Sequence, residues 1–155
     1  MGLSRAMAEP IIHVLNVTND VSEVERANDV LRQLWIRCAL PEHLEAPVTL
    51  CLEEVLSNVI RHGCLPGHSC DIQVSYRILD GSIEVEVSDN ARAFDPLSLP
   101  PPDLNAPLDQ RKAGGLGVFL VRKLMDQVHY EYRNGRNRLV FRKHWHMPLA
   151  GAASE

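Results

Sequence analysis

The chain has no excess of basic residues, no long apolar run and few cysteines, and each absence excludes a class of protein. Its 155 residues carry a formal net charge of −4, which argues against a nucleic-acid-binding protein. No apolar stretch approaches the ~20 residues of a membrane span, and the N-terminus lacks the basic and then apolar layout of a signal peptide. We therefore expect a cytoplasmic protein that does not contact the membrane.

The cysteines do not suggest a scaffold or a metal site. There are four, Cys38, Cys51, Cys64 and Cys70, which is too few for a disulfide framework at this length, so reduced thiols are the simpler expectation. Cys64 and Cys70 alternate with His62 and His68 in one short loop. Structural zinc sites usually pair close ligands across a longer gap, so this spacing does not favour a metal.

Hydrophobic periodicity predicts one α+β domain. The expected elements are, in chain order, a strand at 11–17, helices at 22–38 and 47–62, a hairpin of 72–78 with 83–87, a helix from about 116, and a hairpin of 128–133 with 137–143. Ser22 and Glu25 form a capping-box pair for the first helix, and Asn134-Gly135 is a typical hairpin turn. The hairpins imply an antiparallel or mixed sheet with its helices on one face.

A glycine cluster, Gly114, Gly115 and Gly117, leads directly into the third predicted helix. Free N–H groups and the positive helix end coincide at such a junction, and glycines let a phosphate approach. A dinucleotide fingerprint needs a preceding strand, whereas segment 96–112 holds five prolines and is predicted to be a lid. The P-loop pattern fails because no Gly-Lys-Ser/Thr follows. Plain helix capping and nucleotide binding both stay open.

Two carboxylates and one amide supply candidate chemistry. Glu54 and Asn58 lie four residues apart and project from one helix face. Asn58 is suited to hold a magnesium ion, and Glu54 to accept a proton from an attacking hydroxyl. Asp89 ends the first hairpin, where a carboxylate can accept a hydrogen bond from an exocyclic amine such as that of adenine. Each is equally compatible with a solvated helix face or a turn residue.

Together, these patterns resemble in order and spacing the N, G1 and G2 boxes of the gyrase, Hsp90, histidine kinase and MutL ATPase superfamily. They read Glu54-x-x-x-Asn58, Asp89-Asn90-Ala91-Arg92-Ala93-Phe94-Asp95-Pro96 and Gly114-Gly115-Leu116-Gly117-Val118-Phe119-Leu120-Val121. The length and the ending Leu-Val-Arg-Lys-Leu-Met-Asp are most similar to anti-sigma factor serine kinases of the RsbW and SpoIIAB type. The similarity covers a domain at 11–143, with tails at 1–10 and 144–155.

The resemblance implies a Bergerat-type ATP-binding α/β sandwich, with a mixed, mostly antiparallel sheet, helices on one face, and ATP beneath the lid. It implies Glu54 as the catalytic base, Asn58 as the magnesium ligand and Asp89 as the adenine reader. Further ATP contacts are implied at Ala91, Phe94, Arg111, Lys112, Gly114, Gly115, Leu116, Gly117 and Val118. Of these, Arg111 and Lys112 would steady the γ-phosphate.

Three positions depart from the family pattern. Ala91 stands where the G1 box usually has glycine, which makes the backbone less free to approach adenine. The family's Gly-Thr-Thr entry to the last strand appears as Gly135-Arg136-Asn137-Arg138, which lacks the hydroxyl expected to reach the base through water. Ala113 stands where some members have an arginine.

The implied activity is that of an ATP-dependent serine/threonine kinase and anti-sigma factor. It would phosphorylate a STAS-domain anti-sigma factor antagonist and sequester a sigma factor, in a partner-switching pathway that includes a PP2C-type phosphatase, and it would form a homodimer. Two alternatives remain: a nucleotide-gated binding module without phosphoryl transfer, and a stand-alone histidine kinase catalytic domain. The predicted helix at 22–38 contains no histidine to serve as a phosphoacceptor.

Overall fold

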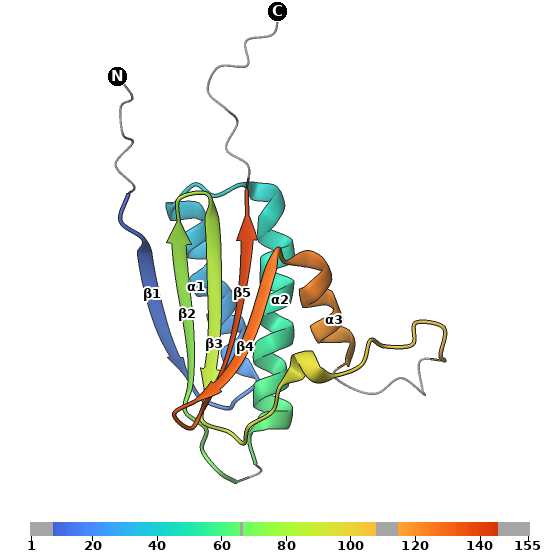
Figure 1. Cartoon of the computed structure of the whole chain (residues 1–155). Helices are drawn as coiled ribbons and strands as arrows, with labels where there is room; N and C mark the ends of the chain where they lie inside the picture. Colours follow the sequence, from blue (N-terminus) through green and yellow to red (C-terminus); the bar gives the residue numbers. More distant parts are fainter. Residues whose placement is uncertain (1–7, 66, 108–114, 146–155) are drawn as a thin grey trace, which may run out of the picture.

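The fold is a five-stranded sheet covered on one face by helices, as the sequence predicted (Figure 1). The computed structural model describes residues 8–65, 67–107 and 115–145. The strand order is β1-β2-β3-β5-β4, with bounds β1 Ile11–Val17, β2 Ile72–Leu79, β3 Ser82–Asp89, β4 Gln127–Arg133 and β5 Arg136–His144. All four pairings between these described strands are antiparallel, so the sheet is not mixed.

Three α-helices pack behind the sheet in Figure 1: α1 Ser22–Arg37, α2 Glu45–Asn58 and α3 Gly115–Leu124. Helix α2 lies between the other two and contacts both. Short helical turns precede and follow α2, η1 at Glu42–Leu44 and the π-helical η2 at Val59–Gly63, and a third, η3 at Pro96–Ser98, follows the first hairpin. The predicted second helix is thus correct in position, although it starts two residues earlier and its last turn is widened.

The core lies between the helices and the facing side of the sheet. On β2, buried residues alternate with half-buried ones, so Val74 and Tyr76 point to the helices. Tyr76 is fully buried and its hydroxyl donates to the carbonyl of Ala27 in α1 at 2.7 Å, which joins sheet and helix layers. Burial of each large core side chain contributes roughly 1.5–3 kcal/mol, and this packing holds the helices against the sheet.

The predicted turn between β4 and β5 is confirmed. Asn134 and Gly135 have φ values of 54° and 73°, the left-handed conformations that a two-residue hairpin turn requires. The turn sets the β4–β5 register, in which Tyr132 lies opposite Asn137. Register matters here because Asn137 then also lies opposite Asp89 on β3.

Helix α1 is not capped by the predicted capping box. Asp20 takes that role: its Oδ1 accepts from the backbone N–H of Ser22 at 2.8 Å and from the Ser22 hydroxyl at 2.6 Å. The Ser22 hydroxyl is therefore engaged by the preceding carboxylate and does not bond forward to the helix. The prediction failed because Asp20, two residues before the helix, is an equally good acceptor for its first N–H groups.

The expectation of four reduced thiols is wrong for two of them. Cys64 and Cys70 form a disulfide, with Cα atoms 5.9 Å apart, whereas Cys38 and Cys51 are free. The short loop between η2 and β2 turns back on itself and brings the two cysteines within the ~4.4–6.8 Å range of disulfide Cα separations. Sequence spacing alone does not reveal such a turn.

The basic residues near the C-terminal end of the sheet are paired with carboxylates. Arg136 pairs with Asp71 at 2.9 Å, Arg138 with Glu86 at 2.7 Å and with Glu131, and Arg142 with Glu84. They lie along a hairpin, as the sequence suggested. None of the described helices is long and apolar enough to cross a membrane.

Candidate nucleotide site

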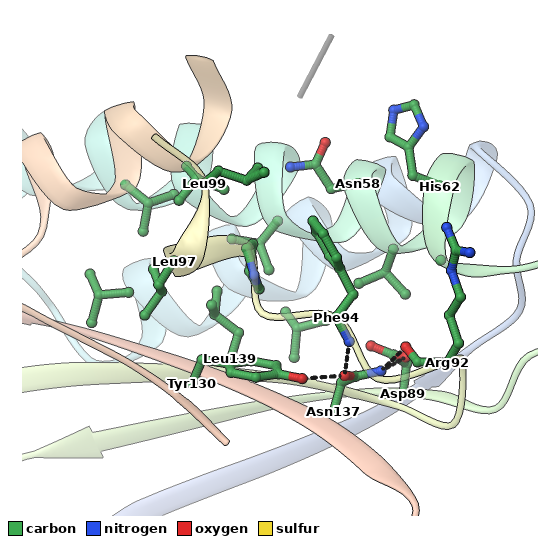
Figure 2. A pocket seen from close by; sticks show the side chains of 18 residues that line it. Asn58, His62, Asp89, Arg92, Phe94, Leu97, Leu99, Tyr130, Asn137 and Leu139 are labelled. Carbon is green, nitrogen blue, oxygen red and sulfur yellow. Dashed lines mark hydrogen bonds between the residues drawn. The ribbon is translucent and has the colours of Figure 1, made fainter. Parts of the chain in front are cut away.

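A cavity of about 260 Å³ opens between α2 and the sheet. Figure 2 shows Asn58 and His62 on its helix side, Asp89, Tyr130 and Asn137 on its sheet side, and Phe94 between them. Its other walls are largely apolar and come from the helices, the strands and η3: Val55, Val59, Gly63, Val87, Arg92, Pro96, Leu97, Leu99, Val118, Val121, Val128 and Leu139. The volume lies just below the ~300 Å³ lower end for ligand pockets, which suits a small flat group such as a base.

Asp89 is the acidic group of this cavity. It is the last residue of β3 and only 4% exposed. Its Oδ1 accepts from the backbone N–H of Ala91 at 3.0 Å and from Nδ2 of Asn137 at 2.9 Å. Among the described residues, its other oxygen, Oδ2, accepts no hydrogen bond. The carboxylate thus has one oxygen fixed by the protein and one available to a ligand.

Burial raises the pKa of Asp89, and the hydrogen bonds from Asn137 and Ala91 partly offset the rise. Arg136 also acts in that direction through its charge. Its guanidinium donates to Ser88 Oγ, next in the chain to Asp89, and to Asp71 Oδ2, each at 2.9 Å. A buried acceptor held this way in an apolar slot can select a flat ring that carries an N–H donor.

The two residues of the predicted α2 pair, Glu54 and Asn58, do not both face the cavity. Asn58 lines the cavity, whereas Glu54, one turn earlier, is not among its lining residues. Glu54 lies instead against Gly117, in the first turn of α3. A Cβ added to Gly117 would approach Oε2 of Glu54 closer than 3.0 Å and would lie 3.3 Å from the Glu54 Cβ and Cδ. The Glu54 side chain therefore occupies the space that the glycine leaves free.

The predicted phosphate loop is described only in part. Helix α3 begins at Gly115, and Val118 lines the cavity. By helix geometry the amides of its first turn, which includes Leu116 and Gly117, have no partner within the helix, and phosphate binding at this end stays a prediction. Arg111, Lys112 and Gly114 lie outside the described residues.

The G1-box residues follow Asp89 around the cavity rim. Phe94 lines the cavity and is about half exposed. Ala91 does not line it; its N–H and carbonyl bond to Asp89 and Asn137, at 3.0 and 3.2 Å. A Cβ added to Gly63 would lie 3.5 Å from the Ala91 Cβ, so Ala91 lies beside η2.

Sequence reasoning missed Tyr130, Asn137 and His62 as cavity residues. From the sequence, Asn137 stands out only because it lies where the family has threonine. In the structure its side chain makes five hydrogen bonds, to Asp89, Ala91, Arg92, Phe94 and Tyr130. A polar residue two positions after a hairpin turn was a usable signal. His62 had one too, since it continues the four-residue spacing of Glu54 and Asn58.

Taken together, the apolar slot, its buried acceptor and a nearby helix N-terminus on an α+β scaffold are features typical of a nucleotide-binding domain. The chain belongs to the histidine kinase-like ATPase domain family, whose model matches residues 17–143.

Curated relatives and a solved structure agree with this assignment. The chain is 32% identical over 114 residues to the serine/threonine-protein kinase BtrW of Bordetella bronchiseptica, which covers 74% of this chain and 80% of that protein. It is 32% identical over 90 residues to the serine-protein kinase RsbW of Listeria monocytogenes, covering 56% and 57% of the two chains.

The RsbU and RsbW domains of Rv1364c from Mycobacterium tuberculosis superpose with a TM-score of 0.60 at 13% identity, over 88% of this chain and 32% of that one. This likeness supports the fold. The family resemblance and the α+β fold predicted from the sequence are confirmed, and the curated relatives are named protein kinases rather than binding modules or histidine kinases.

Proposed function

We propose that this chain is an ATP-dependent serine/threonine protein kinase and anti-sigma factor, which phosphorylates a STAS-type anti-sigma factor antagonist. The observation that carries the proposal is the pairing of a base-sized slot with the N-terminus of α3 beside Glu54. The slot ends at Oδ2 of Asp89, which accepts no hydrogen bond from the residues that the structure describes. The kinase names of the BtrW and RsbW relatives support the reaction class.

The residues present suit ATP with magnesium. Asp89 Oδ2 would accept the exocyclic amine of adenine, and the apolar walls would cover the ring. Asn58 would give one oxygen ligand to Mg²⁺, which usually takes only one or two protein ligands besides phosphates and waters. Bound Mg·ATP would supply the transferable phosphoryl group and the charge-neutralising cation.

Glu54 would act as the base. Its carboxylate contacts the first turn of α3, where the helix amides would hold the phosphates, so a serine hydroxyl approaching there would meet it. Glu54 would take the hydroxyl proton as the oxygen bonds to phosphorus. The products would be ADP and the phosphorylated antagonist, whose new dianionic group would break a packed interface.

The wider role follows from the same proposal. The unphosphorylated antagonist would compete with a sigma factor for this chain, and a PP2C-type phosphatase would reset the antagonist. We also propose a homodimer. Since a sigma factor acts in the cytoplasm, this role would place the chain there.

The test combines the chain with a candidate STAS protein and radiolabelled ATP, and compares wild type with Glu54→Ala. We expect label on a serine or threonine of the STAS protein, stable to acid, and a loss of about 10²–10⁴-fold in the transfer rate for the variant. Glu42→Ala, an exposed acid on η1, is the matched control and should transfer at the wild-type rate. ATP binding without any transfer would show a nucleotide-gated module instead, and acid-labile label would show a histidine kinase.

A further inference from the structure

The carboxamide of Asn137 holds together the end of the cavity that contains Asp89. Asn137 is the second residue of β5 and only 7% exposed. Its Nδ2 donates to Oδ1 of Asp89 at 2.9 Å and to the carbonyls of Ala91 and Arg92 at 3.2 and 3.0 Å. Its Oδ1 accepts from the Phe94 N–H at 3.1 Å and from the Tyr130 hydroxyl at 2.6 Å (Figure 2).

These partners fix the orientation of the amide. Carbonyl and carboxylate oxygens can only accept, and the N–H of Phe94 can only donate, so exchanging Oδ1 and Nδ2 would set acceptor against acceptor. Both lone pairs of Oδ1 and both hydrogens of Nδ2 are engaged. Asn137 has no hydrogen-bonding capacity left for a ligand, although it lines the cavity.

The consequence for Asp89 is a division between its two oxygens. Asn137 and the N–H of Ala91 both bind Oδ1, which leaves Oδ2 as the oxygen without a partner among the described residues. The same carboxamide ties down the turn of residues 91–94, which forms the rim of the cavity. One side chain thus fixes both the acceptor and the wall beside it.

We propose that Asn137 is the positioning residue for base selection: it orients Asp89 so that Oδ2 alone faces the base, and so selects rings that carry an exocyclic N–H donor. The inference rests on the proposed function in that the base is adenine. The direct contact of the Asn137 amide with the Asp89 carboxylate takes the place of the water-mediated hydroxyl contact, which this sequence lacks.

The test compares the affinities of two ligands for each of three proteins, measured by calorimetric titration without a phosphoryl acceptor. The ligands are ATP and purine riboside triphosphate, which lacks only the exocyclic amine. The proteins are wild type, Asn137→Ala and Tyr130→Phe; the last keeps the ring but removes the hydroxyl that donates to Asn137 Oδ1. Circular dichroism and thermal melting establish that each variant is folded.

We expect wild type to prefer ATP over the analogue by about tenfold or more, the scale of a hydrogen bond to a charged group. In Asn137→Ala this ratio should fall towards one, mainly through weaker ATP binding. Tyr130→Phe should show a smaller fall, of about two- to fivefold, because Asn137 keeps four of its contacts.

A merely structural role gives a different result. If Asn137→Ala weakened both ligands by the same factor, or if folded Tyr130→Phe kept the full preference for ATP, the inference would be overturned. Wild type without any preference for ATP would overturn it too. Wild type that prefers ATP but phosphorylates no protein would overturn the proposed kinase function and leave the role of Asn137 intact.

Discussion

Gly117→Ala should slow phosphoryl transfer without destabilising the fold. The Cβ of the new alanine would point at Glu54 and approach its Oε2 closer than 3.0 Å, whereas ordinary van der Waals contact begins at 3.4 Å. The Glu54 Cβ, which is fixed to α2 and lies 3.3 Å from the new methyl group, would need the two helices to move apart by no more than a few tenths of an ångström. The Glu54 carboxylate would have to withdraw by on the order of 1 Å.

Two effects on stability oppose each other and nearly cancel. Alanine is favoured over glycine within a helix by at most about 1 kcal/mol, and Gly117 is the third residue of α3. Moving Glu54 off its preferred rotamer costs about 0.5–1.5 kcal/mol. The free energy of unfolding should therefore change by less than about 1 kcal/mol, which shifts the melting temperature by no more than about 4 °C.

The effect on catalysis is larger. Displacing a catalytic group by about 1 Å can reduce a rate by about 10²-fold, which corresponds to about 2.7 kcal/mol in the activation barrier. The affinity for ATP should change little, because the methyl group points at α2 and away from the Asp89 end of the cavity. Loss of transfer with unchanged stability and binding would thus trace to the position of Glu54.

The assay is single-turnover transfer from radiolabelled ATP to the antagonist, for Gly117→Ala, Glu54→Ala and the double variant. If the glycine acts only through Glu54, the double variant should be no slower than Glu54→Ala alone. Full additivity of the two losses would refute this reasoning and show that Gly117 has a separate role. A wild-type rate in Gly117→Ala would refute the assignment of Glu54 as base.

Three further results are expected. Asp89→Asn should unfold at a higher temperature than wild type at pH 7, while losing ATP binding. Burial raises the pKa of Asp89 in the folded state, so its ionisation opposes folding above the unfolded value of 3.8, and the advantage of the variant should vanish in melts at pH 3. Replacing Cys64 and Cys70 with serine should lower the free energy of unfolding in urea by about 2 kcal/mol, because their disulfide closes a short loop. Tyr76→Phe should cost about 0.5–1.5 kcal/mol in the same assay, without affecting ATP affinity, because it removes one buried hydrogen bond of a residue that does not line the cavity.

Much of the fold could be predicted because it is encoded locally. Alternation over 72–78 places every second side chain against the helices, and Asn134-Gly135 supplies the left-handed turn of the last hairpin. Where two local structures are equally compatible with the sequence pattern, the pattern alone does not predict which one forms. Asp20 rather than Ser22 caps α1, and the loop that joins Cys64 to Cys70 depends on how η2 meets β2.

The cavity was only partly predictable because its sheet side depends on pairing between distant strands. Asp89 and Asn137 are 48 residues apart in the chain and meet through the β3–β5 register. Motif spacing identifies Asp89 from its own neighbours but carries no information about what lies across the sheet. Glu54 illustrates the converse: its helical spacing from Asn58 is as expected, yet the absence of a side chain at Gly117 decides where its carboxylate lies.

The two ends of the cavity are held by different elements, so binding and transfer can be changed separately. At the base end, Asp89 and Asn137 are fixed by neighbouring strands of the sheet. At the other end, α3 packs against Glu54 through its first turn, while Arg122 in its second half donates to the carbonyl of Leu97 in η3 at 2.6 Å. Because Leu97 lines the cavity, a shift of α3 would change both its packing against Glu54 and the position of the cavity wall, and would leave the Asp89–Asn137 pair in place. Substitutions on α3 should therefore alter the rate of transfer at constant base preference, and substitutions at Asn137 should do the reverse.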